Sequence, residues 1–115
     1  MNALQALALS GSREGGKVVI KVCGELDFAT APSMIEAARR AVNKSAAECI
    51  IDCEEVTFID SETFKMLLAF QKELSLTGKS LYLRNCSRQM TRPLILLGLE
   101  TTLEFSPRDD PKPSI

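Results

Sequence analysis

Apolar residues recur at two different spacings along the chain. Segments rich in β-branched or closely spaced apolar residues predict four strands, at Leu4–Leu9, Lys17–Cys23, Cys49–Cys53 and Leu81–Leu83. Val56–Ile59 carries the third strand onward, and Leu103–Phe105 is typical of a last edge strand. Turn residues fill Ser10–Gly16, and Gly24–Asp27 is expected to end the second strand.

Helical spacing of apolar residues appears between these strands. The first helix is expected to start after an N-cap at Thr30, with its apolar face formed by Met34, Ile35, Ala38, Ala41 and Val42. A second helix is predicted from Ser61 to Leu76, stopped by Gly78. A third opens at Ser87 or Thr91 and closes at Gly98, and Pro93 favours a regular part that begins near Thr91.

The resulting order is β-β-α-β-α-β-α with a final β. Strands that alternate with helices predict an α/β fold: one domain with a small, mixed, mostly parallel sheet packed against helices. The 115 residues fit a single domain, which we place at residues 1–106. Prolines and charges after that point predict a disordered tail at residues 107–115.

Composition excludes several classes of function. The chain has no histidine, which removes the histidine-based triads and metal sites, and its net charge of −1 offers no basic footprint for nucleic acid. No apolar run is long enough for a membrane span, and the N-terminus is a poor signal peptide. We therefore expect a cytoplasmic protein.

Four cysteines, Cys23, Cys49, Cys53 and Cys86, lack the CxxC spacing of common metal and redox motifs. We favour small buried hydrophobic side chains over metal ligands, because free cysteine is among the most buried residue types. A disulfide scaffold is also disfavoured, since a chain of this size holds a core without cross-links. No metal or other cofactor is expected.

A polar cluster interrupts the passage from the third strand to the second helix, at Asp60-Ser61-Glu62-Thr63. Helix capping by Asp60, with Glu62 favoured by the helix dipole, explains the cluster in structural terms. In functional terms, Ser61 stands at the carboxyl edge of the sheet, where α/β proteins place their sites. A phosphate acceptor there needs only exposure and an external kinase, whereas a nucleophile needs a nearby base.

Four short motifs in order resemble the STAS family: Gly24-Glu25-Leu26-Asp27, Thr30-Ala31-Pro32, Phe58-Ile59-Asp60-Ser61 and Leu97-Gly98-Leu99. The resemblance extends from about Leu4 to Phe105, and its single-domain bacterial members are anti-sigma-factor antagonists. It implies a phosphorylation-switched binding module with Ser61 as the acceptor. The implied partners are an anti-sigma factor that is itself a serine protein kinase, a PP2C-type phosphatase and, indirectly, a sigma factor.

The same resemblance implies a partner-binding surface at the start of the second helix, formed by Asp60, Ser61, Glu62, Thr63, Lys65 and Met66. Asp27, in the loop before the first helix, is a second candidate contact. Met66 and Phe70 lie partly off the apolar stripe of the second helix, and we favour ordinary core positions for both.

The motif departs from the family pattern at two positions. Glu62 and Thr63 stand where a second hydroxyl residue and a glycine are usual, so a permanent charge adjoins the acceptor, and the close backbone approach that glycine permits is lost. Two other roles stay open: a structural STAS subunit of a lipid-transport ABC complex or stress-signalling assembly, and an enzyme with Ser61 as nucleophile. The enzyme is disfavoured, because carboxylates of ordinary pKa are poor bases for a serine hydroxyl.

Overall fold

The computed structural model describes residues 7–42, 46–96, 98 and 103–107. Its elements confirm the predicted order. In sequence they are β1 (Leu7–Glu14), β2 (Lys17–Leu26), α1 (Ala31–Val42), β3 (Glu48–Ile59), α2 (Ser61–Ser75), β4 (Ser80–Cys86), α3 (Arg88–Leu96) and β5 (Glu104–Pro107).

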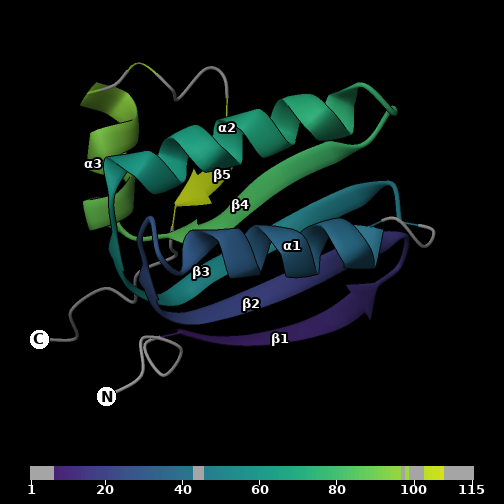
Figure 1. The fold of residues 1–115 in the computed structure, drawn as a ribbon, viewed down its shortest axis with the longest axis horizontal. Coiled ribbons are helices and arrows are strands. Elements are labelled where there is room, and N and C mark those ends of the chain that lie inside the picture. The colour runs from purple at the N-terminus through teal and green to yellow at the C-terminus, as the bar shows by residue number, and fades with distance from the viewer. Residues whose placement is uncertain (1–6, 43–45, 97, 99–102, 108–115) are drawn as a thin grey trace, which may run out of the picture.

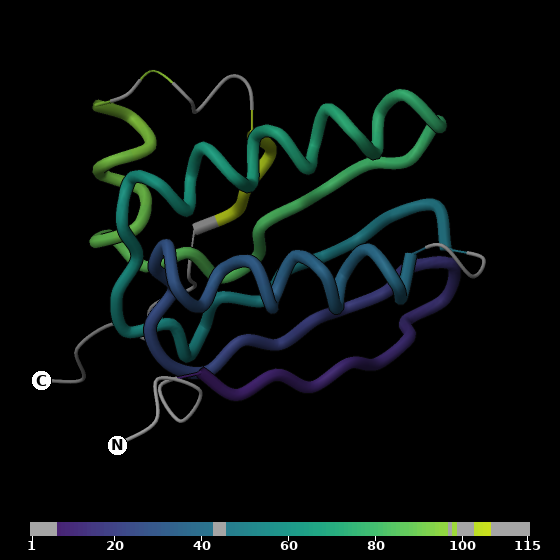
Figure 2. The backbone as a smooth tube through the Cα atoms, viewed as in Figure 1, coloured from purple at the N-terminus to yellow at the C-terminus, as the bar shows by residue number. Residues whose placement is uncertain are grey.

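The five strands form one mixed sheet in the order β1-β2-β3-β4-β5. Strand β1 is antiparallel to β2, and the other three pairings are parallel. Figure 1 shows α1 and α2 lying over the same face of the sheet, with α3 at one end. Figure 2 follows the backbone from β2 through α1 into β3, and from β3 through α2 into β4. The carboxyl ends of the parallel strands therefore meet where α2 and α3 begin.

The core fills the space between the helices and one face of the sheet. Alternation along β2 sends Val18, Ile20 and Val22 into this core. Lys17 and Lys21 lie on the opposite face, where they pair with Glu48 and Glu55 of β3. Helices contribute the largest buried side chains, among them Met34, Phe64, Leu67, Phe70, Met90 and Leu94. Phe70 is thus a core residue, as favoured from the sequence, while Met66 is half-buried against the same cluster.

An arginine joins the two helices that cover the sheet. The Arg39 guanidinium of α1 donates to both carboxylate oxygens of Glu73 in α2, at 2.6 and 2.9 Å. It also donates to Glu36, and it lies 5.6 Å from the centroid of the Phe70 ring. A bidentate contact of this kind fixes both the distance and the orientation between the two side chains, so it helps to set how α1 and α2 pack.

The predicted ends of β1, β2 and β4 fell short of the observed ones, and β4 continues from the predicted Leu83 to Cys86. Strand β1 continues to Glu14 instead of ending at Leu9, because Ser10, Gly11, Ser12 and Arg13 all pair with β2 and the hairpin turn is confined to Gly15-Gly16. Its predicted first residues, Leu4–Gln5–Ala6, lie outside the described part. Strand β2 likewise runs through Gly24 to Leu26, because β3 extends far enough to pair with it.

The helix boundaries needed smaller corrections. Thr30 precedes α1, but its hydroxyl turns back to the loop, donating to the Glu25 carbonyl at 2.8 Å and accepting from the Asp27 N–H. Helix α3 begins at Arg88 and not near Thr91, because the Ser87 hydroxyl caps the Met90 N–H. Pro93 is therefore inside α3. Gly78 and Gly98 follow α2 and α3 with positive φ, as expected of terminating glycines.

Three of the four cysteines are buried, and Cys23 is exposed, which corrects the prediction that all four are buried. Cys49 and Cys53 lie two pleats apart on the core face of β3, and burial raises the pKa of the Cys49 thiol to about 12. Cys23 instead shares the solvent face of β2 with Lys21. None of the described helices is long and apolar enough to cross a membrane. Of the predicted tail, only Pro107 is described, and it pairs with Cys86.

Candidate functional site

Helix α2 begins immediately after β3, with only Asp60 between them. Asp60 has extended backbone angles, and its Oδ1 accepts the Thr63 N–H at 2.8 Å and the Thr63 hydroxyl at 2.7 Å. The predicted N-cap is confirmed. Because an N-cap carboxylate satisfies donors that the helix cannot, it fixes the direction in which the next residue, Ser61, is presented.

The second oxygen of Asp60 ties this helix to a distant loop. Its Oδ2 accepts the Phe28 N–H at 3.0 Å, while the Asp60 N–H donates to the Leu26 carbonyl. Partial burial by itself would raise the pKa of the Asp60 carboxyl. The hydrogen bonds from Thr63 and Phe28 outweigh it and hold the pKa below its ordinary value. The carboxylate is thus ionised at neutral pH and fully engaged in holding two segments together.

Asp27 shapes the loop that approaches α2. Its Oδ1 accepts the N–H groups of Ala29 and Thr30 at 2.9 and 3.0 Å, an Asx-type turn. The turn places Phe28 at the tip of the loop with 68% of its surface exposed. Asp27 was expected to contact a partner, and in the structure it positions Phe28 next to the start of α2.

Ser61, Glu62 and Lys65 are all exposed on the first turns of α2. Within the described part of the chain, the Ser61 hydroxyl has no hydrogen-bond partner. Glu62 pairs with Lys65 at 3.2 Å, and both side chains are more than half exposed. An exposed pair of this kind contributes at most about 1 kcal/mol, so it yields readily to another contact.

Thr63 points inward and is completely buried. Its hydroxyl is held by Asp60, so its side chain does not stand between Ser61 and an approaching protein. Thr63 lacks the backbone freedom of a glycine, but its side chain completes the cap from inside and does not cover the surface. Of the two departures from the family motif, only Glu62 changes the surface.

Two exposed aromatic residues lie in the segments that meet Asp60 before α2. Phe58, near the end of β3, is 52% exposed, and Phe28 is more exposed still. A shallow cleft of about 320 Å³ adjoins Phe58, lined by Val56, Thr57, Phe58, Ile59, Ser87, Gln89 and Met90. Sequence reasoning treated Phe58 as part of a strand and did not single out Phe28. The sequence signal that could have identified Phe28 is an aromatic residue within a polar loop.

The residues gathered here suit binding better than catalysis. Asp60 and Glu62 are the two carboxylates adjacent to Ser61 in sequence. Asp60 has a lowered pKa, and its oxygens accept hydrogen bonds from Thr63 and Phe28, while Glu62 pairs with Lys65. A general base for a serine hydroxyl needs a raised pKa and a free lone pair. Among the described residues, no three metal-ligating side chains come together. The site therefore presents an exposed hydroxyl, a charged pair and two aromatic rings.

Comparison with known proteins finds relatives that share one described role. The anti-sigma-F factor antagonist RsfB of Mycobacterium tuberculosis is 28% identical over 107 residues, 91% of this chain and 85% of the relative. An anti-sigma factor antagonist from Mycobacterium paratuberculosis superposes with a TM-score of 0.79 at 27% identity, covering 96% of this chain and 93% of the other.

More distant structures share the fold. Unphosphorylated SpoIIAA, an anti-sigma factor antagonist, superposes with a TM-score of 0.70 at 22% identity, covering 86% of this chain and 88% of the other. The family model described as "Mlab, STAS domain" matches residues 9–104, which include β2, β3, β4 and the three helices in full, most of β1 and the first residue of β5. The chain therefore belongs to the STAS domain family.

Proposed function

We propose that this protein is an anti-sigma-factor antagonist whose contact with its partner is centred on Ser61 and is broken when Ser61 is phosphorylated. The observation that carries the proposal is the exposed Ser61 hydroxyl at the first position of α2, next to Asp60, which binds the loop of the exposed Phe28, and three residues after the exposed Phe58. Exposed aromatic side chains are typical anchors of protein interfaces. The antagonist function named for relatives at 27–28% identity supports the same role.

Phosphorylation acts on this surface through charge. It adds about −1.5 to −2 charges at neutral pH, beside the carboxylates of Asp60 and Glu62. The positive end of the α2 helix dipole interacts favourably with the phosphate, so the fold stays intact. A partner that buries Phe28 and Phe58 would have to desolvate the phosphate as well. A penalty of about 3 kcal/mol already weakens binding more than a hundredfold.

The bond pattern around Asp60 separates the switch from the scaffold. The two carboxylate oxygens of Asp60 accept hydrogen bonds from Thr63 and Phe28, so neither oxygen is needed to bind a phosphate or a partner. Glu62, by contrast, points to solvent and pairs only with Lys65 among the described residues. We infer that Glu62 and Lys65 contact the partner together with Ser61 and half-buried Met66, while Asp27 and Thr63 act indirectly by holding this surface in place.

The partner is an anti-sigma factor with serine kinase activity, and a PP2C-type phosphatase reverses the modification. In this scheme the protein is a substrate and a binding module, not an enzyme, which agrees with the lowered pKa of Asp60. Both partners and the sigma factor act in the cytoplasm, where we place this protein too.

The decisive experiment combines phosphate mapping with binding. The protein is incubated with ATP and its cognate kinase-type anti-sigma factor, and mass spectrometry locates the phosphate. We expect it on Ser61, with Ser61→Ala unmodified and still bound. Ser61→Asp should bind at least tenfold more weakly. Ser75→Asp, an exposed serine at the far end of α2, is the matched control and should bind like wild type. Binding without phosphate on Ser61 would remove the switch and leave the docking role.

A structural STAS subunit is the second candidate, and the permanent charge of Glu62 beside Ser61 favours it. In that role the same face would bind its partner without modification. Co-purification with an ATPase and a permease, together with an unmodified Ser61, would support this candidate. Loss of that complex in Phe58→Ala but not in Ser61→Asp would distinguish it from the switched antagonist.

A further inference from the structure

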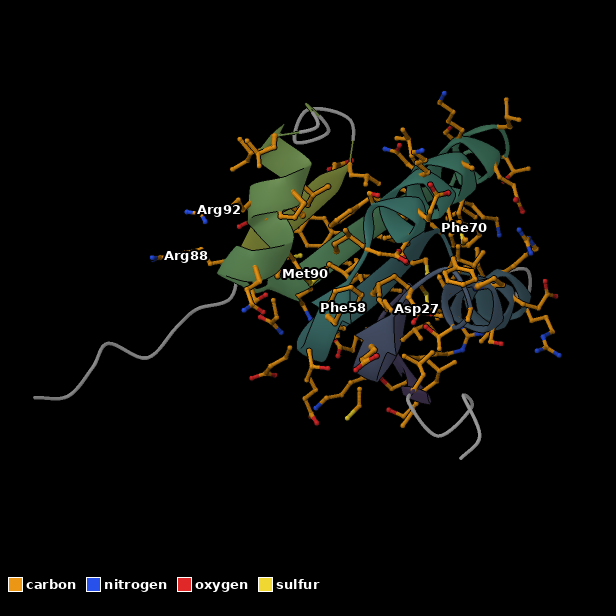
Figure 3. All side chains as sticks on the ribbon, turned by 60° about the vertical axis from the view of Figure 1, so that its left-hand side comes forward. Asp27, Phe58, Phe70, Arg88, Met90 and Arg92 are labelled. Carbon is orange, nitrogen blue, oxygen red and sulfur yellow. The ribbon has the colours of Figure 1, made fainter. Side chains whose placement is uncertain are left out.

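The outer face of α3 combines charge with exposed apolar surface. Met90 and Leu94 turn inward to the core, so the helix is anchored through one side. On the other side Arg88 and Arg92 follow at a spacing of one turn and are exposed, and Leu96 continues the same row at 78% exposure. Figure 3 shows both arginine side chains extending away from the body of the protein.

A shallow groove of about 390 Å³ runs along this face, lined by Arg88, Gln89, Arg92, Pro93 and Leu96. The groove thus offers two cationic donors and an apolar floor formed by Pro93 and Leu96.

Arg88 and Arg92 differ from Arg39 and Arg84, which stabilise the fold through ion pairs. Arg39 and Arg84 are each held by two carboxylates, Glu36 and Glu73 for the first, Glu14 and Asp52 for the second. Arg88 and Arg92 have no carboxylate within 4.0 Å in the ranges that the structure describes. Arginine beside exposed apolar side chains is characteristic of protein interfaces, where bidentate carboxylate contacts supply orientation.

The groove adjoins the cleft beside Phe58, which precedes Ser61 by three residues. Gln89 lines both this groove and the cleft, so the two share a wall. Figure 3 shows Phe58, Met90, Arg88 and Arg92 along one side of the molecule. The two arginines make the outer part of this surface basic.

We propose that the α3 groove docks an acidic, apolar segment of the same partner that contacts Ser61. The segment's carboxylates pair with Arg88 and Arg92, and an apolar side chain packs on Pro93 and Leu96. This inference rests on the proposed function and adds the partner's chemistry: its contact surface must carry acidic residues opposite α3. Charge complementarity of this kind favours one orientation and disfavours partners that are basic at the same place.

The test is a charge reversal measured against the kinase-type anti-sigma factor by calorimetry. The double variant Arg88→Glu/Arg92→Glu should bind at least about tenfold more weakly than wild type. Its affinity should also fall less between 50 and 500 mM salt, because the screened attraction is already gone. Arg40→Glu, an exposed arginine on α1, is the matched control and should change affinity less than twofold.

Other outcomes overturn the proposal in distinguishable ways. If the double variant binds with wild-type affinity while Phe58→Ala does not bind, the α3 contact is refuted and the proposed function stands. If the wild-type protein does not bind the anti-sigma factor, both proposals are refuted. Stronger binding after deletion of residues 108–115 assigns the groove to the chain's own tail. A dimer in sedimentation that the double variant dissociates assigns it to a second copy.

Discussion

The backbone N–H of Phe28 donates to Oδ2 of Asp60 at 3.0 Å, although 32 positions separate the two residues. Because the other oxygen of the same carboxylate caps α2, one side chain fixes both the loop that carries Phe28 and the helix that carries Ser61. The spatial relation between an exposed aromatic ring and an exposed hydroxyl is therefore set by Asp60.

Replacing Asp60 by alanine should destabilise the fold by about 1–3 kcal/mol, since it removes the cap and leaves the buried Thr63 hydroxyl without its acceptor. Asp60→Asn retains an oxygen acceptor and should cost less. Urea unfolding followed by circular dichroism measures both. Equal losses in the two variants would contradict the capping account.

Replacing Thr63 by valine tests whether this residue contributes to the stability of the fold and not to partner binding. The isosteric change removes the hydroxyl that bonds to Asp60 and should cost about 1 kcal/mol of unfolding free energy. Affinity for the partner should stay within twofold, because Thr63 is buried. Thr57→Val, at an exposed position of β3 whose hydroxyl makes no hydrogen bond within the described part of the chain, serves as control and should change stability by less than about 0.5 kcal/mol. A folded Thr63→Val protein that no longer binds would place Thr63 in the contact.

Asp52 should govern part of the acid stability. Burial tends to raise the pKa of its carboxyl, but hydrogen bonds from Asn85, the Glu54 N–H and Arg84 outweigh this and lower the pKa below the ordinary 3.8. A pKa lowered by folding means that the ionised group stabilises the fold above about pH 4. That stabilisation is lost as the pH falls through the lower, folded pKa.

Asp52→Asn should accordingly be less stable at pH 7 and lose less stability between pH 5 and pH 2 than wild type, in urea titrations at stepped pH. Glu25→Gln, an exposed position without an ion pair in the described ranges, is the control and should follow the wild-type profile. Parallel acid profiles for Asp52→Asn and wild type would refute this role.

Lys79 should stabilise the end of α1. Its Nζ donates to the carbonyls of Val42 and Ala46, at 3.0 and 3.2 Å, and so satisfies the carbonyl of the last residue of α1 and one just before β3. Lys79→Met should cost about 1–2 kcal/mol of unfolding free energy. The exposed Lys72→Met is the comparison and should cost less than about 0.5 kcal/mol. A loss of the same size in both variants would argue against the cap.

Local sequence signals predicted the Asp60 cap correctly because a cap acts within four residues. They did not single out Phe28, whose exposure follows from the Asp27 turn, or Phe58, whose exposure depends on what covers that part of β3. Between Lys21 and Leu26, β3 accommodates two more residues than β2. The two shifts bring Val56 into the core and restore the original alternation at Ile59, which no single-strand pattern records.

Periodicity in the sequence determined the order of strands and helices, the apolar faces of α1 and α2, and Ser61 at the start of α2, because each depends on neighbours a few residues away. Only the tertiary structure decided that Thr63 points inward, that Phe28 is tied to Asp60, and that α3 presents Arg88 and Arg92 beside the same surface. These relations join segments that are distant in the chain, and they arise only when the sheet brings the ends of its parallel strands together.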